Sequence, residues 1–203
     1  MPCSFQALDG GINNIRSISQ RVLATHWTRI ASGNQIPRFD QFDFESRIHD
    51  PKQLAVWHVE QRNGPIVLRA LYSGRLLNEP FNAGWEGRTL EELTPPSLHS
   101  AIVSGSHECV RTGYAIYMIL RTCDSMGYPV DLERLLLPFG RNGQVEQIVA
   151  SLQLISLEGM ADRKKIIHDF EKQADCILSV RIPCVRANTT STGKISDRAE
   201  FER

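Results

Sequence analysis

The feature that most constrains the fold is an Asn-Gly pair, Asn142-Gly143, between two long apolar runs. The runs read YPVDLERLLLPF over residues 128–139 and QVEQIVASLQLIS over residues 144–156. An Asn-Gly pair in this setting is the strongest short-range signal for a β-hairpin, because both residues tolerate the positive φ angles of a tight turn. The sequence therefore predicts a long hairpin over residues 128–156.

A third strand is predicted directly upstream, over residues 113–123 (GYAIYMILRTC), joined to the hairpin by turn residues at 124–127. Side chains alternate between the two faces of a strand. One face would carry Tyr114, Ile116, Met118 and Leu120, and the other Ala115, Tyr117, Ile119 and Arg121. Since both faces are largely apolar, we expect helices to cover both.

The first half of the chain supplies a second hairpin and several helices. Strands are predicted over residues 53–62 and 65–72, with Asn63-Gly64 as their turn. Residues 73–93 favour only short helical pieces, whereas the apolar spacing of residues 95–112 predicts a longer helix. A five-stranded antiparallel sheet with helices inserted after its second strand buries one face beneath them, and its last strand can lie beside its first.

An N-terminal helix is predicted from Asn13, with Asn13 or Asn14 as its cap and Ser32-Gly33-Asn34 as its end. Residues 1–11 are expected to be loose. The apolar face of the helix would comprise Ile15, Ile18, Val22, Leu23, Trp27 and Ile30. Such a helix either covers the sheet or pairs with a second copy of the chain, and the sequence leaves both open.

The C-terminal part divides into three segments. Residues 159–174 predict an amphipathic helix that either packs on the domain or transmits a change to a partner. Residues 176–182 (CILSVRI) favour a short strand, and the polar residues 185–203 favour disorder. The predicted organisation is an N-terminal helix and connector over 1–50, a sheet domain over 51–156, a C-terminal helix and possible short strand over 157–183, and a disordered tail over 184–203.

Four segments resemble the PAS family, in particular the single PAS domains of alphaproteobacteria. They are HW at 26–27, LYSGR at 71–75, GWEGRTLEEL at 84–93 and ERLLLPFG at 133–140, and the similarity covers roughly residues 20–156. The resemblance implies an α+β fold, with a PAS-like five-stranded antiparallel sheet, helices on one face, an N-terminal helix and a C-terminal extension. It also implies a non-catalytic sensory or interaction module, often dimeric, with a cleft between the sheet and the short helices.

Composition disfavours several classes of partner. The 23 basic and 23 acidic residues balance, so the chain lacks the electrostatic footprint of a nucleic-acid binder. No apolar run is long enough for a membrane span, and the N-terminus does not read as a signal peptide, so we expect a cytoplasmic protein. The five scattered cysteines fit reduced thiols better than a disulfide framework.

No motif predicts catalysis or a metal centre. His107-Glu108-Cys109 with Cys123 lacks the paired Cys-x-x-Cys of zinc deaminases. His99 lies on the helix that the resemblance associates with a haem ligand, but a lone histidine is more often structural, so haem is disfavoured. The Asn-Cys-Arg-Phe motif of light-sensing PAS domains is absent, which also disfavours a photochemical flavin. The cofactor is therefore unknown.

Five residues are predicted to contact a ligand in the cleft: Arg75, Trp85, Tyr114, Met118 and Arg134. Arg134 shares an otherwise apolar strand face with Val130, Leu132 and Leu136. Its planar guanidinium could orient a carboxylate or phosphate in a mostly apolar pocket, or could instead form an ion pair with Glu146 or Glu133. Trp85 is equally explained as a packing anchor.

These observations predict a non-enzymatic cytoplasmic sensory module that responds to a small molecule or a partner. We expect a homodimer formed through the N-terminal helix, together with a signalling protein partner of unknown identity. The alternative is a pure protein-protein interaction module whose core is filled and holds no ligand.

Overall fold

The computed structural model of the chain describes residues 7–31, 36–44, 46–61, 64–79, 84–123, 127–158 and 174–184. The helix predicted for residues 159–174 falls outside this part of the chain, apart from Ala174, and so does the tail after residue 184. Residues 32–34, residue 63 and residues 124–126, which were predicted to end a helix or form turns, also lie outside it.

Within the described residues, seven strands form one sheet in the order β1-β7-β4-β5-β6-β2-β3. The strands are β1 (Leu8–Asp9), β2 (Leu54–Glu60), β3 (Val67–Ser73), β4 (Ala115–Cys123), β5 (Pro129–Arg141), β6 (Gln144–Ser156) and β7 (Asp175–Ile182). All neighbours are antiparallel except β1 and β7, which are parallel. The predicted five-stranded antiparallel core, β2 to β6, is confirmed. β7 confirms the predicted short strand, while β1 falls in a segment expected to be loose.

The hairpin of β5 and β6 turns at Asn142 and Gly143, whose φ angles are 52° and 78°. Positive φ at both turn residues is the geometry that the Asn-Gly pair predicted. Next to the turn, the register shifts between Phe139 and Gly140. A β-carbon at Gly140 would collide with the carbonyl oxygen of Gln144, so this close approach of two backbones requires glycine.

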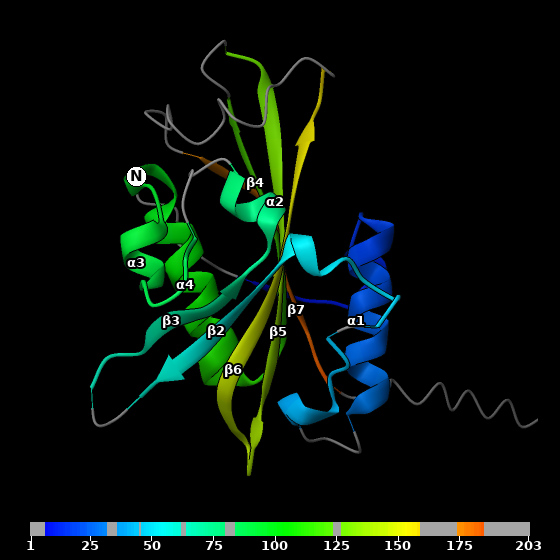
Figure 1. Cartoon of the computed structure of the whole chain (residues 1–203). Helices are drawn as coiled ribbons and strands as arrows, with labels where there is room; N and C mark the ends of the chain where they lie inside the picture. Colours follow the sequence, from blue (N-terminus) through cyan, green and yellow to red (C-terminus); the bar gives the residue numbers. More distant parts are fainter. Residues whose placement is uncertain are drawn as a thin grey trace, which may run out of the picture.

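The helices lie on both sides of the sheet (Figure 1). They are α1 (Ile18–Ile30), α2 (Arg75–Asn78), α3 (Leu90–Leu93) and α4 (Pro96–Thr112), with single 3-10 turns at Ile12–Asn14, Phe39–Gln41 and Pro51–Gln53. Helices α2, α3 and α4 cover one face, and α1 covers the other (Figure 1). The short helical pieces and the longer helix predicted between β3 and β4 are confirmed.

Helix α1 begins later than the sequence predicted. Its cap is Ser17, whose hydroxyl accepts a hydrogen bond from the backbone N–H of Gln20 at 3.3 Å, whereas Asn13 and Asn14 belong to a separate 3-10 turn. The predicted apolar face is also wrong in part, because Ile18 is 78% exposed. The buried residues are Gln20, Leu23, Ala24 and Trp27, so α1 covers its own sheet.

Two apolar cores lie on either side of the sheet, as the alternation predicted. Ile116, Met118 and Leu120 of β4 belong to the core beneath α2, α3 and α4. Ala115, Tyr117 and Ile119 belong to the core beneath α1. Each strand of the central meander therefore contributes to both layers, and a residue's position in the alternation decides which layer it joins.

Trp27 gives a test of how α1 is held. Its side chain is fully buried, and its indole N–H donates to the carbonyl of Pro138 at 2.8 Å. We expect Trp27→Ala to lower the free energy of unfolding by about 3–5 kcal/mol, because it leaves a large cavity and an unpaired carbonyl. Urea denaturation measures the change.

The control is Ile18→Ala on the exposed side of the same helix, which should change the free energy of unfolding by no more than about 0.5 kcal/mol. Equal losses for the two variants would contradict the packing of α1 on the sheet.

Candidate functional site

A cavity of about 340 Å³ lies between the sheet and the helices of its α2–α4 side. This volume is within the range of about 300–1,000 Å³ typical of small-molecule sites. The apolar lining consists of Trp57, Leu76, Leu77, Trp85, Leu90, Leu93, Pro95, Leu98, Ile102, Leu132, Leu152, Leu154 and Ile155. The polar lining consists of Gln53, Thr94, Arg134 and Gln153. A mostly apolar wall with a few polar groups is suited to bind a small molecule.

One wall of the cavity is the glycine-rich segment around Trp85, which the end of β3 holds in place. The backbone N–H and the hydroxyl of Ser73 donate to the Glu86 carboxylate at 2.8 and 2.9 Å, and the Ser73 hydroxyl accepts from the N–H of Trp85 at 3.1 Å. The Trp85 ring is buried, with its centroid 5.9 Å from that of Trp57. Trp85 is thus both a packing anchor and a lining residue.

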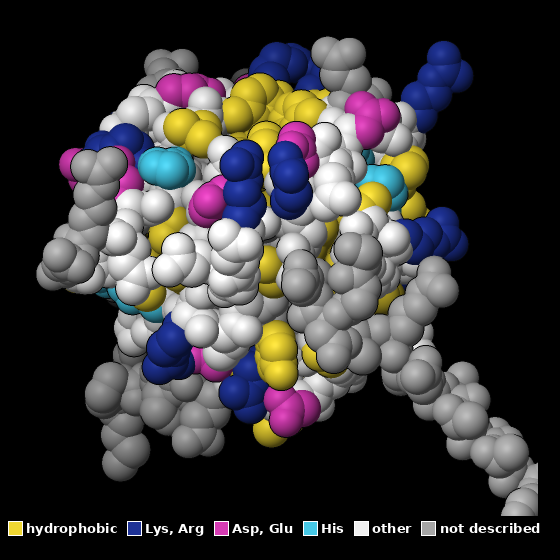
Figure 2. Space-filling view, turned by 90° about the horizontal axis from the view of Figure 1, so that it is seen from below, with side chains coloured by type: hydrophobic (Ala, Val, Ile, Leu, Met, Phe, Trp, Pro, Cys, Tyr) yellow, Lys and Arg dark blue, Asp and Glu magenta, His cyan; other side chains and the backbone are white. Residues whose placement is uncertain are grey.

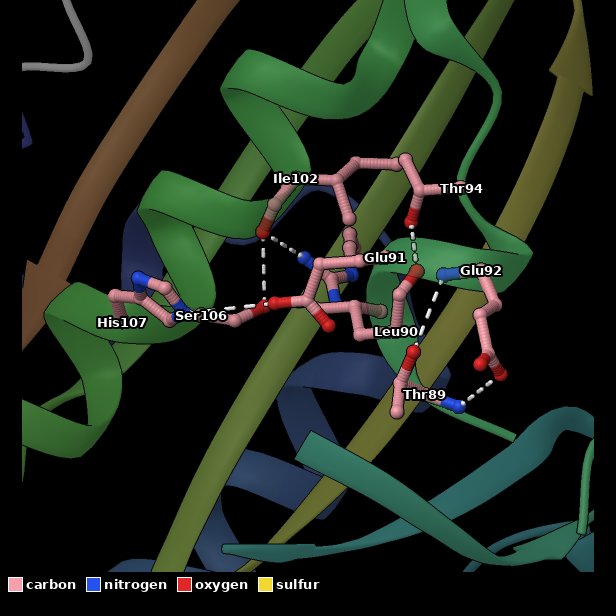
Figure 3. A network of polar contacts seen from close by, with 9 residues as sticks. Thr89, Leu90, Glu91, Glu92, Thr94, Ile102, Ser106 and His107 are labelled. Atoms are coloured by element: carbon pink, nitrogen blue, oxygen red, sulfur yellow. Dashed lines mark hydrogen bonds and ion pairs between the residues drawn. The ribbon is translucent and has the colours of Figure 1, made fainter. Parts of the chain in front are cut away.

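Another wall is formed by α3 and the start of α4, whose local polar contacts Figure 3 shows. Thr89 and Glu92 make a reciprocal cap for the short helix α3, each side chain accepting from the backbone N–H of the other. The hydroxyl of Thr94 donates to the carbonyl of Leu90 at 2.6 Å, which closes α3 just before α4 begins. These local bonds hold Leu90 and Leu93 against the cavity.

Among the described residues that line the cavity, Arg134 is the one that carries a charge, and only 2% of its surface is exposed. Its guanidinium donates to the carbonyl of Ile102 at 3.0 Å and to the hydroxyl of Ser106 at 3.0 Å. The Ser106 hydroxyl in turn donates to the same Ile102 carbonyl at 2.8 Å (Figure 3). Arg134 therefore fastens β5 to the middle of α4 through neutral acceptors.

The ion pair considered for Arg134 is not formed. Glu146 lies 3.8 Å from Arg141 near the hairpin turn, and Glu133 is one residue out of phase with Arg134, so it faces α1 instead. Across the described part of the chain, no carboxylate oxygen lies within 4.0 Å of the Arg134 guanidinium. That alternative is wrong because neighbouring residues of a strand point to opposite faces, which separates Glu133 from Arg134, and because Glu146 lies beside Arg141 instead.

Burial shifts the pKa values of two groups here in opposite directions. It lowers the pKa of Arg134 to about 10, which still leaves the guanidinium charged at neutral pH. It raises the pKa of the fully buried Cys109 thiol well above its usual range. Cys109 therefore stays protonated and supplies no negative charge to Arg134.

Of the five predicted ligand contacts, Trp85 and Arg134 line the cavity. Arg75 is exposed and pairs with Glu79 at 3.0 Å, Tyr114 is 40% exposed ahead of β4, and Met118 is fully buried in the apolar core. None of these three is part of the lining. A ligand-binding role for Trp85 and Arg134 stays a prediction.

The sequence analysis overlooked most of the apolar lining, although a signal for it exists. Leu98 and Ile102 share the sheet-facing side of α4, and Leu152 and Leu154 share one face of β6. Helical and strand periodicity identify both pairs as inward-facing. Periodicity does not tell whether an inward-facing residue packs tightly or borders a cavity, which explains why they were overlooked.

Neither a metal site nor a membrane span is found in the part of the chain that the structure describes. Within its ranges, no three His, Cys, Asp or Glu side chains gather as metal ligands, and no helix is long and apolar enough to cross a membrane. His99, considered as a haem ligand, is exposed on α4 and is not among the lining residues of the cavity.

The balanced charge is also visible on the molecular surface. Figure 2 shows one face of the molecule, where basic and acidic side chains are interspersed. Ion pairs also occur among the described residues of the whole molecule, such as Arg69 Nε with Glu60 Oε1 at 2.7 Å. A surface of this kind does not produce a field of one sign on this face.

The strand order decides the fold. Helices α2, α3 and α4 are inserted between β3 and β4, and β6, the last strand of the five-stranded core, lies between β5 and β2. This is the arrangement that the resemblance implied. The fold is PAS-like. The five core strands form the PAS-like sheet, and β1 and β7 extend it beyond β4.

Solved structures similar to this chain include light–oxygen–voltage (LOV) domains. The light state of the blue-light photoreceptor Aureochrome1 LOV matches at 14% identity over 53% of this chain and 84% of that one, with a TM-score of 0.39. The LOV protein of Rhodobacter sphaeroides matches at 14% identity over 69% of this chain and 70% of that one, with a TM-score of 0.38. No family model and no curated protein matches the chain.

The comparison contradicts one cofactor prediction. We predicted that a photochemical flavin is disfavoured because the Asn-Cys-Arg-Phe motif is absent, yet the matched proteins are described as blue-light and light–oxygen–voltage receptors. That prediction is withdrawn.

Glu86 gives a pH test of the cavity wall. Partial burial raises the pKa of its carboxyl. Hydrogen bonds from Ser73 and from nearby backbone N–H groups together lower the pKa by more than burial raises it, so the pKa of Glu86 lies below the ordinary 4.5. A lowered folded-state pKa contributes stability above the unfolded value, and this contribution is lost as the pH falls through the folded-state pKa.

We therefore expect Glu86→Gln to destabilise the protein at neutral pH, with the difference from wild type shrinking below pH 4.5. Urea denaturation over a pH series measures it. Glu146→Gln, which removes an exposed carboxylate near the hairpin turn, is the control for the loss of one negative charge. A difference for Glu86→Gln that stays constant with pH would contradict the role assigned to this carboxylate.

Proposed function

We propose that this chain is a non-enzymatic, cytoplasmic sensory module whose PAS-like domain binds a small molecule between the sheet and α2–α4. The observation that carries the proposal is the cavity of about 340 Å³ with its mostly apolar lining. A cavity of this size is large for a close-packed interior, where voids bigger than a water molecule are few. It matches the volume and the composition of small-molecule sites.

A ligand there would bridge two structural layers. Leu132 and Leu152 belong to the sheet, whereas Leu98 and Ile102 belong to α4, and all four line the cavity. A ligand shifts a conformational equilibrium when it binds one arrangement better than another. A molecule that contacts both layers would favour the arrangement of α4 and sheet that fits it, which is the response expected of a sensor.

The alternative, an interaction module without a ligand, is favoured by the apolar residues that remain exposed on α1. Ile18 is 78% exposed and Val22 is 42% exposed, and both project from the helix that we predicted to form a homodimer. A homodimer through α1 and an unidentified signalling partner remain predictions. A dimer contact through α1 is compatible with a ligand in the cavity, because α1 and the cavity lie on opposite faces of the sheet.

Binding of the uncharged fluorescent dye Nile red tests the cavity. We expect saturable binding to the wild-type protein, and an affinity lowered about tenfold or more in Leu98→Phe, whose larger side chain occupies part of the cavity. Leu71→Phe is the matched control, since Leu71 is 50% exposed on β3 and is not a lining residue. Fluorescence titration measures each affinity.

Equal affinities for Leu98→Phe and Leu71→Phe would contradict a ligand site in this cavity and would favour the interaction module. Mass spectrometry of protein purified from cells supplies a second measurement. A small molecule that co-purifies with wild type and is depleted in Leu98→Phe would support the proposal.

A further inference from the structure

Arg134 carries a buried charge that the described part of the chain does not neutralise. Its two hydrogen-bond partners, the Ile102 carbonyl and the Ser106 hydroxyl, satisfy donors but bring no negative charge. A guanidinium has five N–H donors, and the described bonds occupy two of them. Because burying an unpaired charge is costly, most buried charges in proteins have a counter-ion.

The buried carboxylates of α4 and β5 do not pair with Arg134: Glu108 and Asp131 pair with other arginines, and Glu133 lies on the opposite face of the sheet. Glu108, on the same helix as Ser106, pairs with Arg181 at 3.3 Å. Asp131, on the same strand as Arg134, receives a two-pronged pair from Arg121 at 2.8 and 3.0 Å on the opposite face of the sheet. The sequence places carboxylates within three residues of Arg134 on β5, yet the fold turns them away from it.

We infer that the cavity recognises an amphipathic anion, whose carboxylate or phosphate headgroup pairs with Arg134 and whose apolar body lies against the leucine and tryptophan lining. This inference rests on the proposed function and specifies the chemistry of its ligand. The planar guanidinium matches both headgroups through parallel N–H···O bonds. The apolar lining excludes a small, wholly polar anion as the preferred ligand, because such an ion would leave the lining unfilled.

The burial of the lining orients the ligand. Arg134 is 2% exposed, Leu98 is 3% exposed and Leu132 is 6% exposed, whereas Leu152 and Leu154 on the same face are only partly buried. The headgroup therefore enters first, toward Arg134, and the apolar body extends toward Leu154. Arg134 donates hydrogen bonds to Ile102 and Ser106 in the middle of α4. A headgroup that binds the same guanidinium therefore competes with or reorients these bonds and acts on α4.

Calorimetric titration with three ten-carbon ligands tests the headgroup: decanoate and decyl phosphate below their micelle concentrations, and decanol below its solubility limit. We expect decanoate or decyl phosphate to bind the wild-type protein about ten- to hundredfold more tightly than decanol, the range of a charge-assisted hydrogen bond. This comparison needs no variant, so it does not depend on whether a substitution at a buried arginine folds.

Two variants then locate the effect. Arg134→Gln should lower the affinity for the anion to that for decanol and leave decanol unchanged, whereas Arg134→Lys should retain part of the preference because it keeps the charge but loses the fork. Arg75→Gln is the matched control, since Arg75 is exposed, pairs with Glu79 and is not a lining residue. It should behave as wild type.

The outcomes separate this inference from the function on which it rests. If decanol binds as tightly as the anions, or if Arg134→Gln keeps the anion preference, the inference is overturned while the small-molecule cavity stands. It is also overturned if Nile red binds and none of the three decyl compounds does. If neither the dye nor any decyl compound binds, both the inference and the proposed function fail.

Discussion

The pairing of β6 with both β5 and β2 is the constraint on which the rest of the structure depends. In its pairing with β5, β6 runs from Ser156 opposite Val130 to Gln144 opposite Arg141. In its pairing with β2, it runs from Ser151 opposite Leu54 to Gln147 opposite His58. The first contact is local and follows from the hairpin, whereas the second joins segments about ninety residues apart. This pairing places the helices between β3 and β4 over the sheet. The cavity lies in the space between them.

Strand β5 connects the two sides of this sheet through two adjacent residues. Arg134 faces the cavity and is bonded to α4, while the backbone carbonyl of Glu133 accepts from the amide of Gln20 on α1 at 3.3 Å. The same Gln20 amide donates to the carbonyl of Ser151 on β6 at 3.0 Å. A shift of β5 or β6 caused at the cavity would therefore move α1 through these Gln20 hydrogen bonds. α1 is the helix with exposed Ile18 and Val22.

Much of the fold followed from local signals, and the departures have clear causes. The Asn142-Gly143 turn, the two hairpins and the α4 helix were predicted because turn chemistry and side-chain periodicity act over a few residues. The start of α1 was misplaced because Asn13 and Ser17 are both good caps, and the choice depends on a 3-10 turn at Ile12–Asn14. Ile18 fits the helical period yet is exposed, since the helix turns a neighbouring face to the sheet.

The sequence by itself determined that a single arginine, Arg134, falls in phase with apolar residues on a buried strand, and that Trp85 lies in a turn-rich segment expected to wall the cleft. Only the tertiary structure decided what each touches. Arg134 meets Ile102 and Ser106 rather than Glu133 or Glu146, because α4 crosses that face of β5 while alternation and the hairpin turn carry both glutamates away. Periodicity assigns a residue to a face, whereas its partner depends on which distant segment packs there.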